Sequence, residues 1–205
     1  PCTDGVMIAD TVQIGTGTTI LPGTILLGNT TIGKDCLIGP NTYIMDGTVG
    51  NGVTLDNVKL TDSTVEAGAD AGPFVQIRGG SLLHTGVHIG DFVEVKNSTV
   101  GAGTKSAHLT YIGDSDVGAG VNFGCGTVTV NYDGKNKRRC KIGDGAFIGC
   151  NTNLVAPVEV GDRAYIAAGS TITDDIPGEA LSIARARQVN KPGWVTEKKP
   201  YKEKK

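Results

Sequence analysis

Hydrophobic positions follow a period of six along most of this chain. An aliphatic residue is followed by a small or acidic one, and a small or β-branched residue stands four positions after the aliphatic. Steps of five, as from Val95 to Val100, keep the phase. Examples of the aliphatic pairs are Ile8-Ala9, Ile14-Gly15, Ile32-Gly33, Ile38-Gly39, Ile89-Gly90, Val100-Gly101, Ile112-Gly113, Val117-Gly118, Ile142-Gly143, Ile148-Gly149, Val160-Gly161 and Ile166-Ala167.

This period predicts one short strand and one turn per repeat, because helical faces recur about every 3.6 residues. Three such strands make a triangular coil of about 18 residues, and successive coils hydrogen-bond at about 4.8 Å. About 28 repeats between Ile8 and Ile172 predict roughly nine coils. The predicted fold is therefore an all-β parallel solenoid.

The repeat has one long interruption. Ile142 follows Thr129 by thirteen positions, where six would continue the period. The interruption contains NYDGKNKRRCK, which is polar and carries the turn dipeptide Asp133-Gly134. We expect residues 130–141 to leave the solenoid as an outward loop, and such insertions commonly lie on the binding face.

The pattern ends after Ile172. We predict a solenoid domain over residues 1–177 and a C-terminal arm with a basic tail over 178–205. Residues 179–189 fit either a short helix or a strand.

Composition agrees with an all-β chain. Glycine is frequent, at 31 of 205 residues, and aromatic residues make up 5%. The net charge of −2 conceals a basic end, because Arg185 to Lys205 carries eight basic and two acidic residues, a net of +6. Such an end can meet phosphates of a ligand or of nucleic acid. We interpret the last eight residues as a solvated terminus and expect no nucleic-acid partner.

The five cysteines contain no CxxC pair, and their odd number argues for reduced thiols in a cytoplasmic protein. No apolar run approaches the length that a membrane-spanning helix needs, and no signal peptide begins the chain, so we expect no membrane association. The sequence begins at Pro1, which we interpret as a fragment or a processed chain.

Three histidines in a solenoid raise the alternative of a zinc site. His84 and His88 precede His108 by more than a coil, and their spacing does not predict convergence. We interpret both as exposed turn residues. His108 stands beside Thr110 and Tyr111, and an imidazole needs only a small environmental shift to act as a base. The carboxylate of Glu94, about one coil earlier, is placed to fix its tautomer.

Arg78 precedes Lys96 by one full coil of the repeat, so we expect the two to stack on one edge of the solenoid. An Arg fork with ammonium groups suits a phosphate, and Lys137 in the predicted loop is a third candidate. Each is also compatible with a solvated surface. Asn122, Asn131 and Tyr132 add neutral donors and acceptors. Together these residues predict a pocket for a polar, phosphorylated small molecule.

The chain contains, in this order, PFVQIR, FVEVKN, KSAHLTYIGD, VNFGCGT, NYDGKNK, VAPVEVGD and IAAGSTIT. The period resembles that of the hexapeptide-repeat acyltransferases. The segments resemble the acetyltransferase domain of the bifunctional uridyltransferase/glucosamine-1-phosphate N-acetyltransferase family, over nearly the whole chain. The resemblance implies a left-handed parallel β-helix and a homotrimer with sites between solenoids. It also implies acetyl transfer from acetyl-CoA to the 2-amino group of glucosamine 1-phosphate, which supplies UDP-N-acetylglucosamine for envelope polymers such as peptidoglycan and lipopolysaccharide.

By this likeness His108 is the base that deprotonates the sugar ammonium. The implied ligands of the sugar phosphate are Arg78, Lys96, Tyr111, Asn122 and Lys137. The implied acetyl-CoA positions are Cys125, Asn131, Tyr132, Cys150, Ala168 and Arg185. Amides near Asn131 and Tyr132 are placed to stabilise the tetrahedral oxyanion. No metal is implied for this domain.

The chain departs from the family in three places. Nothing resembles the uridyltransferase half, so we expect neither UDP-sugar synthesis nor a magnesium requirement. Cys150 stands where Ser is common, and a thiol is a weaker hydrogen-bond partner. Gln76 and Gly79 replace a frequent Arg and Pro around Arg78. The alternatives that remain open are another hexapeptide-repeat acyltransferase and a non-catalytic solenoid scaffold.

Overall fold

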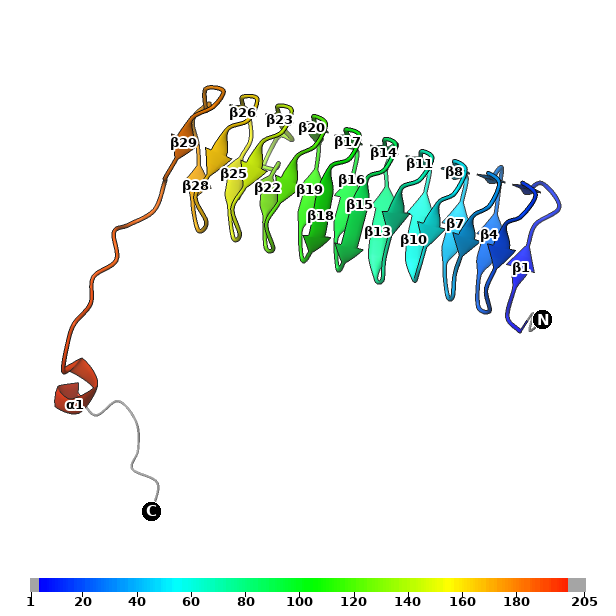
Figure 1. The fold of residues 1–205 in the computed structure, drawn as a ribbon, viewed down its shortest axis with the longest axis horizontal. Coiled ribbons are helices and arrows are strands. Elements are labelled where there is room, and N and C mark those ends of the chain that lie inside the picture. Colours follow the sequence, from blue (N-terminus) through cyan, green and yellow to red (C-terminus); the bar gives the residue numbers. More distant parts are fainter. Residues whose placement is uncertain (1–3, 199–205) are drawn as a thin grey trace, which may run out of the picture.

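A computed structural model of the protein describes residues 4–198, most of which form a row of stacked triangular coils (Figure 1). Three parallel sheets of ten, nine and ten strands are the sides of the prism. The chain passes from sheet 1 to sheet 2 to sheet 3 and then begins the next coil. The structure confirms the predicted β-solenoid, with about one coil more than the repeat count gave.

The strands are short, and each is named here by its sheet. Sheet 1 contains β1 (Met7–Ile8), β4 (Ile25–Leu27), β7 (Tyr43–Met45), β10 (Val58–Thr61), β13 (Val75–Arg78), β16 (Glu94–Lys96), β19 (Tyr111–Gly113), β22 (Val128–Val130), β25 (Asn153–Val155) and β28 (Thr171–Ile172). Sheet 2 contains β2 (Gln13–Ile14), β5 (Thr31–Ile32), β8 (Thr48–Val49), β11 (Thr64–Val65), β14 (Leu82–Leu83), β17 (Thr99–Val100), β20 (Ser115–Val117), β23 (Cys140–Ile142) and β26 (Val158–Val160). Sheet 3 contains β3 (Thr19–Ile20), β6 (Leu37–Ile38), β9 (Thr54–Leu55), β12 (Asp70–Ala71), β15 (His88–Asp91), β18 (Lys105–His108), β21 (Asn122–Phe123), β24 (Phe147–Ile148), β27 (Tyr165–Ile166) and β29 (Leu181–Ser182).

From Leu26 onward the aliphatic residues of the repeat stack inward, as predicted, whereas Ile8 and Ile14 in the first coil are exposed. In β13, Val75 and Ile77 are buried while Gln76 and Arg78 face outward. The register sets Ile77 against Val95 in the next coil, so equivalent aliphatics form continuous columns. Burying each such side chain contributes about 1.5–3 kcal/mol, and the columns together form the hydrophobic core.

Small hydroxyl residues line the corner where the chain passes from sheet 1 to sheet 2, called here the 1–2 corner. The Ser115 amide donates to Ser98 Oγ at 2.9 Å, and the Ser98 amide donates to Ser81 Oγ at 3.3 Å. The ladder satisfies backbone groups that the sharp turn leaves without sheet partners. This explains why the repeat places a small polar residue near each corner.

The interruption forms a hairpin, defined here as residues 131–138, which leaves the solenoid between β22 and β23 at the 1–2 corner. Tyr132 and Lys137 pair in an antiparallel bridge. The Asp133 carboxylate accepts from the amides of Lys135 and Asn136 at 2.8 and 2.6 Å. The hairpin is therefore held by its own hydrogen bonds. The outer residues of the predicted loop, 130 and 140–141, belong to strands instead.

The C-terminal segment leaves the body after β29 and runs away from the coils (Figure 1). Residues 181–182 resolve the open choice in favour of a strand, because β29 pairs with β27. The arm then continues to α1 (Trp194–Lys198), which buries none of its residues. Of the last eight residues, only Lys198 is described. No helix in the described part of the chain has the length and apolarity that a membrane crossing needs.

Candidate active site

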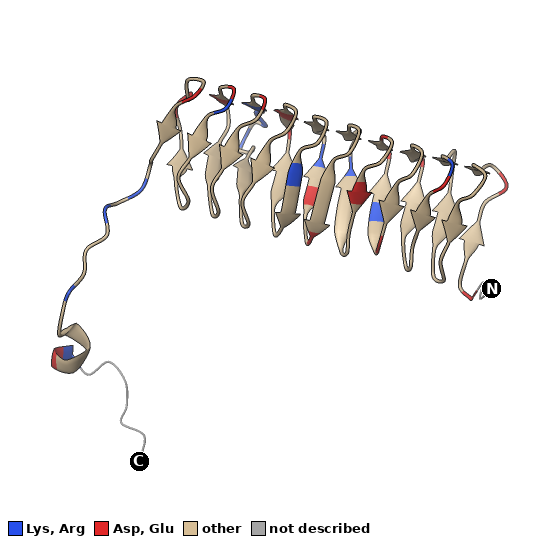
Figure 2. Ribbon diagram, viewed as in Figure 1, with Lys and Arg blue, Asp and Glu red and all other residues tan. Residues whose placement is uncertain are grey.

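Arg78 and Lys96 stand one above the other on the outward face of sheet 1. They are register partners in β13 and β16, as their separation predicted. Arg78 donates to one oxygen of Glu94 through Nε at 2.8 Å and Nη2 at 2.7 Å. The Lys96 side chain is only 16% exposed. The two cations are therefore fixed on one edge of the solenoid, and charged residues gather on the strands of the middle coils (Figure 2).

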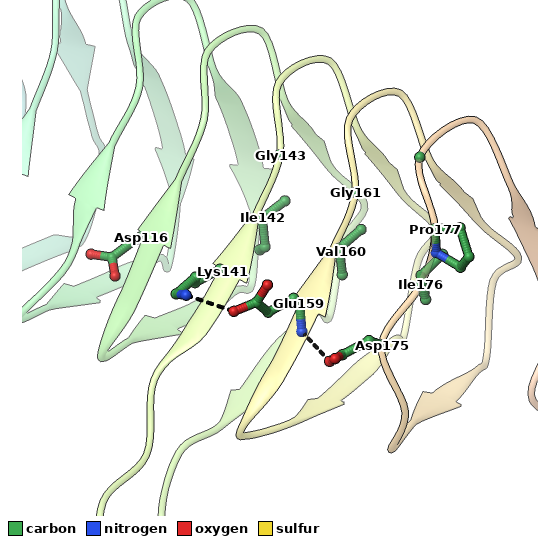
Figure 3. A pocket seen from close by; sticks show the side chains of 11 residues that line it. Asp116, Lys141, Ile142, Gly143, Glu159, Val160, Gly161, Asp175, Ile176 and Pro177 are labelled. Atoms are coloured by element: carbon green, nitrogen blue, oxygen red, sulfur yellow. Dashed lines mark hydrogen bonds and ion pairs between the residues drawn. The ribbon is translucent and has the colours of Figure 1, made fainter.

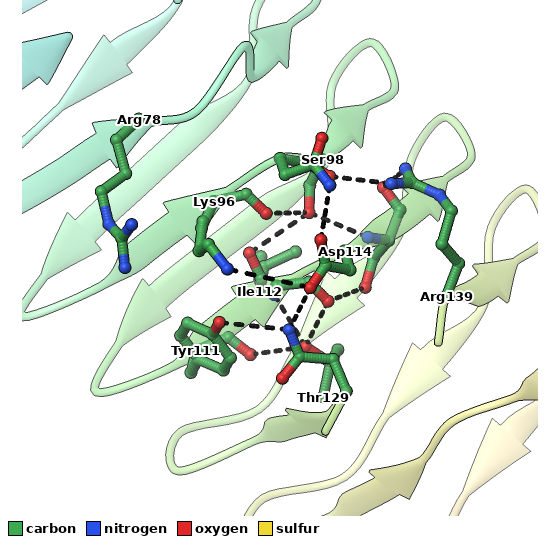
Figure 4. A network of polar contacts seen from close by, with 12 residues as sticks. Arg78, Lys96, Ser98, Tyr111, Ile112, Asp114, Thr129 and Arg139 are labelled. Carbon is green, nitrogen blue, oxygen red and sulfur yellow. Dashed lines mark hydrogen bonds and ion pairs between the residues drawn. The ribbon is translucent and has the colours of Figure 1, made fainter. Parts of the chain in front are cut away.

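Tyr111 joins this edge through its side chain and not through its backbone position. The register partner of Lys96 in the next coil is Gly113, whereas Tyr111 pairs with Glu94. The Tyr111 ring leans over Gly113, and a Cβ at Gly113 would collide with the ring and its hydroxyl. Thr129 holds Gly113 from the following coil, since its Oγ1 accepts from the Gly113 amide at 2.7 Å (Figure 4). The missing Cβ thus lets the phenol lie in the column of the cations.

Asp114 lies at the centre of a polar network beside them (Figure 4). Its side chain is 6% exposed and its nearest cation is Lys96 Nζ, at 3.9 Å. The carboxylate accepts hydrogen bonds from Asn97 Nδ2 at 2.5 Å and from Asn131 Nδ2. Burial raises the pKa of Asp114, but these two hydrogen bonds and the charges of Lys96 and Lys137 outweigh it, so the pKa lies below its usual value. Asp114 is a buried anion.

Lys137 reaches back from the hairpin to Lys96. The Lys96 ammonium lowers the pKa of Lys137, through a direct side-chain interaction and through like-charge repulsion. Asp114 and Tyr111 oppose that effect. Two ammonium groups held together repel each other unless an anion lies between or beside them. This arrangement is typical of a site for a phosphate.

Arg139 fastens the end of the hairpin to the solenoid. Its Nη2 and Nε donate to the Asp116 carboxylate at 2.6 and 3.1 Å. Two further donors reach the carbonyls of Asn97 at 3.0 Å and Ser115 at 3.1 Å. The hydrogen bonds from Arg139 lower the pKa of Asp116, and burial only partly opposes them. A bidentate Arg–carboxylate pair fixes geometry as well as charge, so the hairpin returns at a defined point.

His108 lies at the other border of sheet 1, where the chain passes from sheet 3 to sheet 1, called here the 3–1 corner. It ends β18 and is exposed. Its register partner is Asp91, because the coil between them is shortened relative to three full repeats. The expected partner Glu94 is instead bound to Arg78. Within the described residues the His108 ring has no hydrogen-bond partner, so both of its nitrogens face the surface freely.

Four of the predicted site residues, His108 and three acetyl-CoA positions, lie in one line. Four successive strands of sheet 3 align in register at Ser106, Phe123, Ile148 and Ile166. Two residues after each of these, the chain reaches the 3–1 corner, at His108, Cys125, Cys150 and Ala168 respectively. The Asn151 amide donates to the Cys125 carbonyl at 2.8 Å, and the Gly169 amide to the Cys150 carbonyl at 2.8 Å, which joins the corner from coil to coil. We call this line the corner column.

Arg185 lies at the C-terminal end of the corner column. Its Cδ is 3.7 Å from the point where a Cβ on Gly169 would stand. Asn131 and Tyr132 lie apart from the column, at the 1–2 corner and in the hairpin. Asn122 is also separate, on the outward side of sheet 3 between Lys105 and Phe147. The predicted site residues therefore occupy three regions of one solenoid. These are the sheet 1 edge at the 1–2 corner with its hairpin, the corner column at the 3–1 corner, and the outward side of sheet 3 at Asn122.

The other histidines are not free. His84 Nδ1 lies 3.1 Å from Glu66, and His88 Nδ1 lies 2.6 Å from Asp70, each carboxylate one coil earlier. The His84 contact lowers the pKa of Glu66, although its burial opposes this. His88 begins strand β15 and is not in a turn. Among the described residues there is no cluster of three or more His, Cys, Asp or Glu side chains that could hold a metal.

One hollow lies elsewhere, on the outward side of sheet 2 near its C-terminal end (Figure 3). Its charged residues already have partners: Lys141 Nζ is 2.6 Å from Glu159, Asp175 accepts from the backbone amide of Glu159 at 2.7 Å, and Asp116 is bound by Arg139. None of the catalytic or substrate-binding residues predicted from the sequence lines this hollow. We therefore place the candidate site on sheet 1 and its two corners, which in a single chain is an open surface.

Sequence reasoning missed Gly113, Asp114 and Arg139. Asp114 follows Asn97 by one shortened coil, so counting that coil from the Lys96–Asn97 pair would have pointed to it. The roles of Gly113 and Arg139 depend on where side chains lean, and no spacing reveals that.

Residues 139–174 match the family described as bacterial transferase hexapeptide (six repeats), and residues 29–57 match the hexapeptide repeat of succinyl-transferase. The chain is 58% identical over 188 residues to the bifunctional protein GlmU of Geobacillus sp. (strain WCH70), covering 92% of this chain and 41% of that protein. It is 56% identical over 185 residues to GlmU of Halalkalibacterium halodurans, covering 90% and 41%. The chain thus spans about two fifths of the length of the curated relatives it matches.

A solved structure of LpxA, a UDP-N-acetylglucosamine acyltransferase from Bacteroides fragilis 9343, is similar with a TM-score of 0.62 and 19% identity. The similarity covers 88% of this chain and 70% of that one, and it supports the fold alone. The sequence matches add the hexapeptide repeat and a high identity over nearly the whole chain. The chain is thus similar to the hexapeptide-repeat transferases and, over 92% of its length, to part of the bifunctional GlmU proteins.

Proposed function

We propose that this chain transfers an acetyl group from acetyl-CoA to the 2-amino group of glucosamine 1-phosphate. The proposal rests on the cation set of Arg78, Lys96 and Lys137, which lies at the 1–2 corner of sheet 1. The free ring of His108 lies at the opposite border of the same sheet. The identity to the GlmU proteins over 92% of the chain supports the same substrates. The product then supplies UDP-N-acetylglucosamine synthesis.

In the proposed reaction the phosphate binds the cation set, which leaves the 2-ammonium of the sugar to meet His108. His108 takes one proton from that ammonium, and the freed lone pair attacks the thioester carbonyl of acetyl-CoA. The tetrahedral oxyanion needs backbone donors such as those near Asn131 and Tyr132. The nitrogen of this intermediate still carries one extra proton, which it releases to solvent. On collapse the C–S bond breaks and the imidazolium gives its proton to the leaving CoA thiolate, so each turnover releases one proton overall. Base catalysis of this kind contributes about 10²–10⁴-fold.

Acetyl-CoA is the proposed co-substrate, and the corner column supports a track for it. Three coil steps of about 4.8 Å separate His108 from Ala168, so the column offers roughly 14 Å of edge beyond the base. Beyond His108 the column consists of the small residues Cys125, Cys150 and Ala168. Arg185 at its C-terminal end can bind a phosphate of the nucleotide part of acetyl-CoA. No metal takes part in this scheme.

A homotrimer with sites between solenoids is part of the proposal. Asn122 and the Arg78–Lys96 edge face outward from different sides of one triangular prism, and the hairpin residues Asn131 and Tyr132 are apart from the corner column. Only a second copy can bring two such faces into one pocket. The hairpin, which projects from its own coil, supports this arrangement. A cytoplasmic location agrees with four free cysteines among the described residues.

The test compares His108→Gln with His84→Gln, a matched histidine on the same solenoid that is paired with Glu66. CoA release is measured with acetyl-CoA and glucosamine 1-phosphate. We expect the first variant to lose about 10²–10⁴-fold in kcat and the second to behave as wild type. Glucosamine 6-phosphate, serine and tetrahydrodipicolinate serve as competing acceptors. Turnover on another acceptor alone would favour a different hexapeptide acyltransferase, and no turnover on any would favour a scaffold.

A further inference from the structure

Asp114 uses its carboxylate for more than the turn it occupies. The 1–2 corner repeats a left-handed residue in successive coils, with φ of 47° at Asp62, 69° at Gly79, 47° at Asn97 and 48° at Asp114. Glycine and Asn serve this conformation as well as Asp does. Asp62 is exposed, and within the described residues its side chain makes no hydrogen bond. The turn therefore needs no carboxylate, and the buried charge at Asp114 requires another reason.

The contacts of Asp114 join two groups that belong to different substrates of the proposed reaction. One neighbour is Lys96 Nζ at 3.9 Å, on the phosphate edge. Another is Asn131 Nδ2, at the root of the hairpin. Asn131 Nδ2 also lies 3.3 Å from the Tyr111 hydroxyl, so the same amide touches the phenol over Gly113. Asn97 holds the second carboxylate oxygen and fixes its orientation.

We infer that Asp114 is a positioning residue that holds Lys96 and the hairpin root in one geometry, so that the sugar-phosphate edge and the hairpin are ordered together. This inference rests on the proposed function for its kinetic consequences. Its structural consequence, the ordering of the hairpin, stands without it. The Asp114 carboxylate binds the side-chain amides of Asn97 and Asn131 and the ammonium of Lys96. Neutralising it by substitution with Asn leaves both amides competing for one oxygen, which is costly.

The charge balance gives a signature that a merely structural residue would not. Lys137 faces Lys96, which lowers its pKa, and Asp114 and Tyr111, which raise it. Arg139 also feels the Asp114 charge. In Asp114→Asn the raising effect of the carboxylate is lost, so Lys137 releases its proton at lower pH. The basic limb of the kcat/KM profile for the sugar phosphate then moves toward neutral pH.

The experiment compares Asp114→Asn with Asp62→Asn, which changes the same residue type in the same backbone conformation. We expect Asp114→Asn to raise KM for glucosamine 1-phosphate and lower kcat, together by 10- to 100-fold in kcat/KM, with the basic limb displaced. In the ligand-free protein we expect faster hydrogen exchange at the backbone amides of residues 132–138, whose register depends on Asn131. Asp62→Asn should leave both measurements at wild-type values.

Wild-type kinetics and wild-type exchange in Asp114→Asn would overturn the inference. If wild-type protein does not turn over glucosamine 1-phosphate, the proposed function fails, while the exchange comparison still decides the role of Asp114. Should Asp114→Asn not fold, Asn97→Gly carries the test, because glycine accepts the left-handed turn and only one amide donor is lost. We then expect smaller changes of the same sign, and unchanged exchange would overturn the inference.

Discussion

Replacing Gly113 with Ala tests how the Tyr111 ring is placed. Gly113 has an ordinary strand conformation, so alanine fits its backbone without strain. The added Cβ, however, would stand 2.6 Å from Tyr111 Cε1 and still nearer the phenol oxygen. The backbone cannot retreat, because Thr129 holds the Gly113 amide at 2.7 Å. The ring must therefore leave the column of Arg78 and Lys96.

The magnitude follows from what the ring gives up. Its hydroxyl loses the contact with Asn131 Nδ2 at 3.3 Å and its position beside the phosphate edge. One neutral hydrogen bond is worth about 0.5–1.5 kcal/mol, and about 1.4 kcal/mol corresponds to a factor of ten. We expect KM for glucosamine 1-phosphate to rise roughly 2- to 12-fold. The free energy of unfolding should change by less than about 1 kcal/mol. Alanine is more favourable than glycine in a strand, which offsets part of the stability lost with the Tyr111 contact.

The assay is steady-state kinetics with each substrate varied in turn, together with urea unfolding. Tyr111→Phe is the comparison, since it removes the hydroxyl and leaves the ring in place. We expect it to reproduce most of the KM effect. A Gly113→Ala protein with wild-type KM for the sugar phosphate would refute the reasoning. An effect confined to acetyl-CoA would assign Tyr111 to the other substrate.

Two further predictions concern the thiols. Burial raises the pKa of Cys140 from 9.0 to about 11, so its neutral thiol contributes about 2–3 kcal/mol that is fully present below pH 9 and is lost as pH rises toward 11. The stability difference between wild type and Cys140→Ala, from denaturant titrations at pH 8 to 11, should fall by that amount, and a constant difference would contradict the burial argument. Cys150 is exposed and lies in the corner column, so Ellman's reagent should modify it in the folded protein, while the buried Cys36 and Cys140 react slowly. Saturating acetyl-CoA should slow the reaction of Cys150, and an unchanged rate would remove Cys150 from the co-substrate track.

The repeat alone determined the architecture of this protein. A period of six is incompatible with a helix, and stacking the same aliphatic position in every coil leaves one solution, in which Ile77 meets Val95 and each later coil follows. The stacking of Arg78 on Lys96 and the outward hairpin followed from the same counting. Individual strand ends and the fate of residues 179–189 were beyond it, because β29 forms only where β27 offers an unpaired edge.

The arrangement of the site depended on the tertiary structure. The sequence analysis put Glu94 near His108, but the register partner of His108 is Asp91, whereas Glu94 lies beyond the corner in β16 and binds Arg78. The Tyr111 ring over Gly113 and the anion of Asp114 between Lys96 and Asn131 depend on side-chain directions at corners. The repeat determines where a backbone lies, whereas charge and space among neighbouring coils determine where its side chains point. The sequence therefore specified the solenoid and the residues on its edges, and only the packed coils decided which of those residues meet.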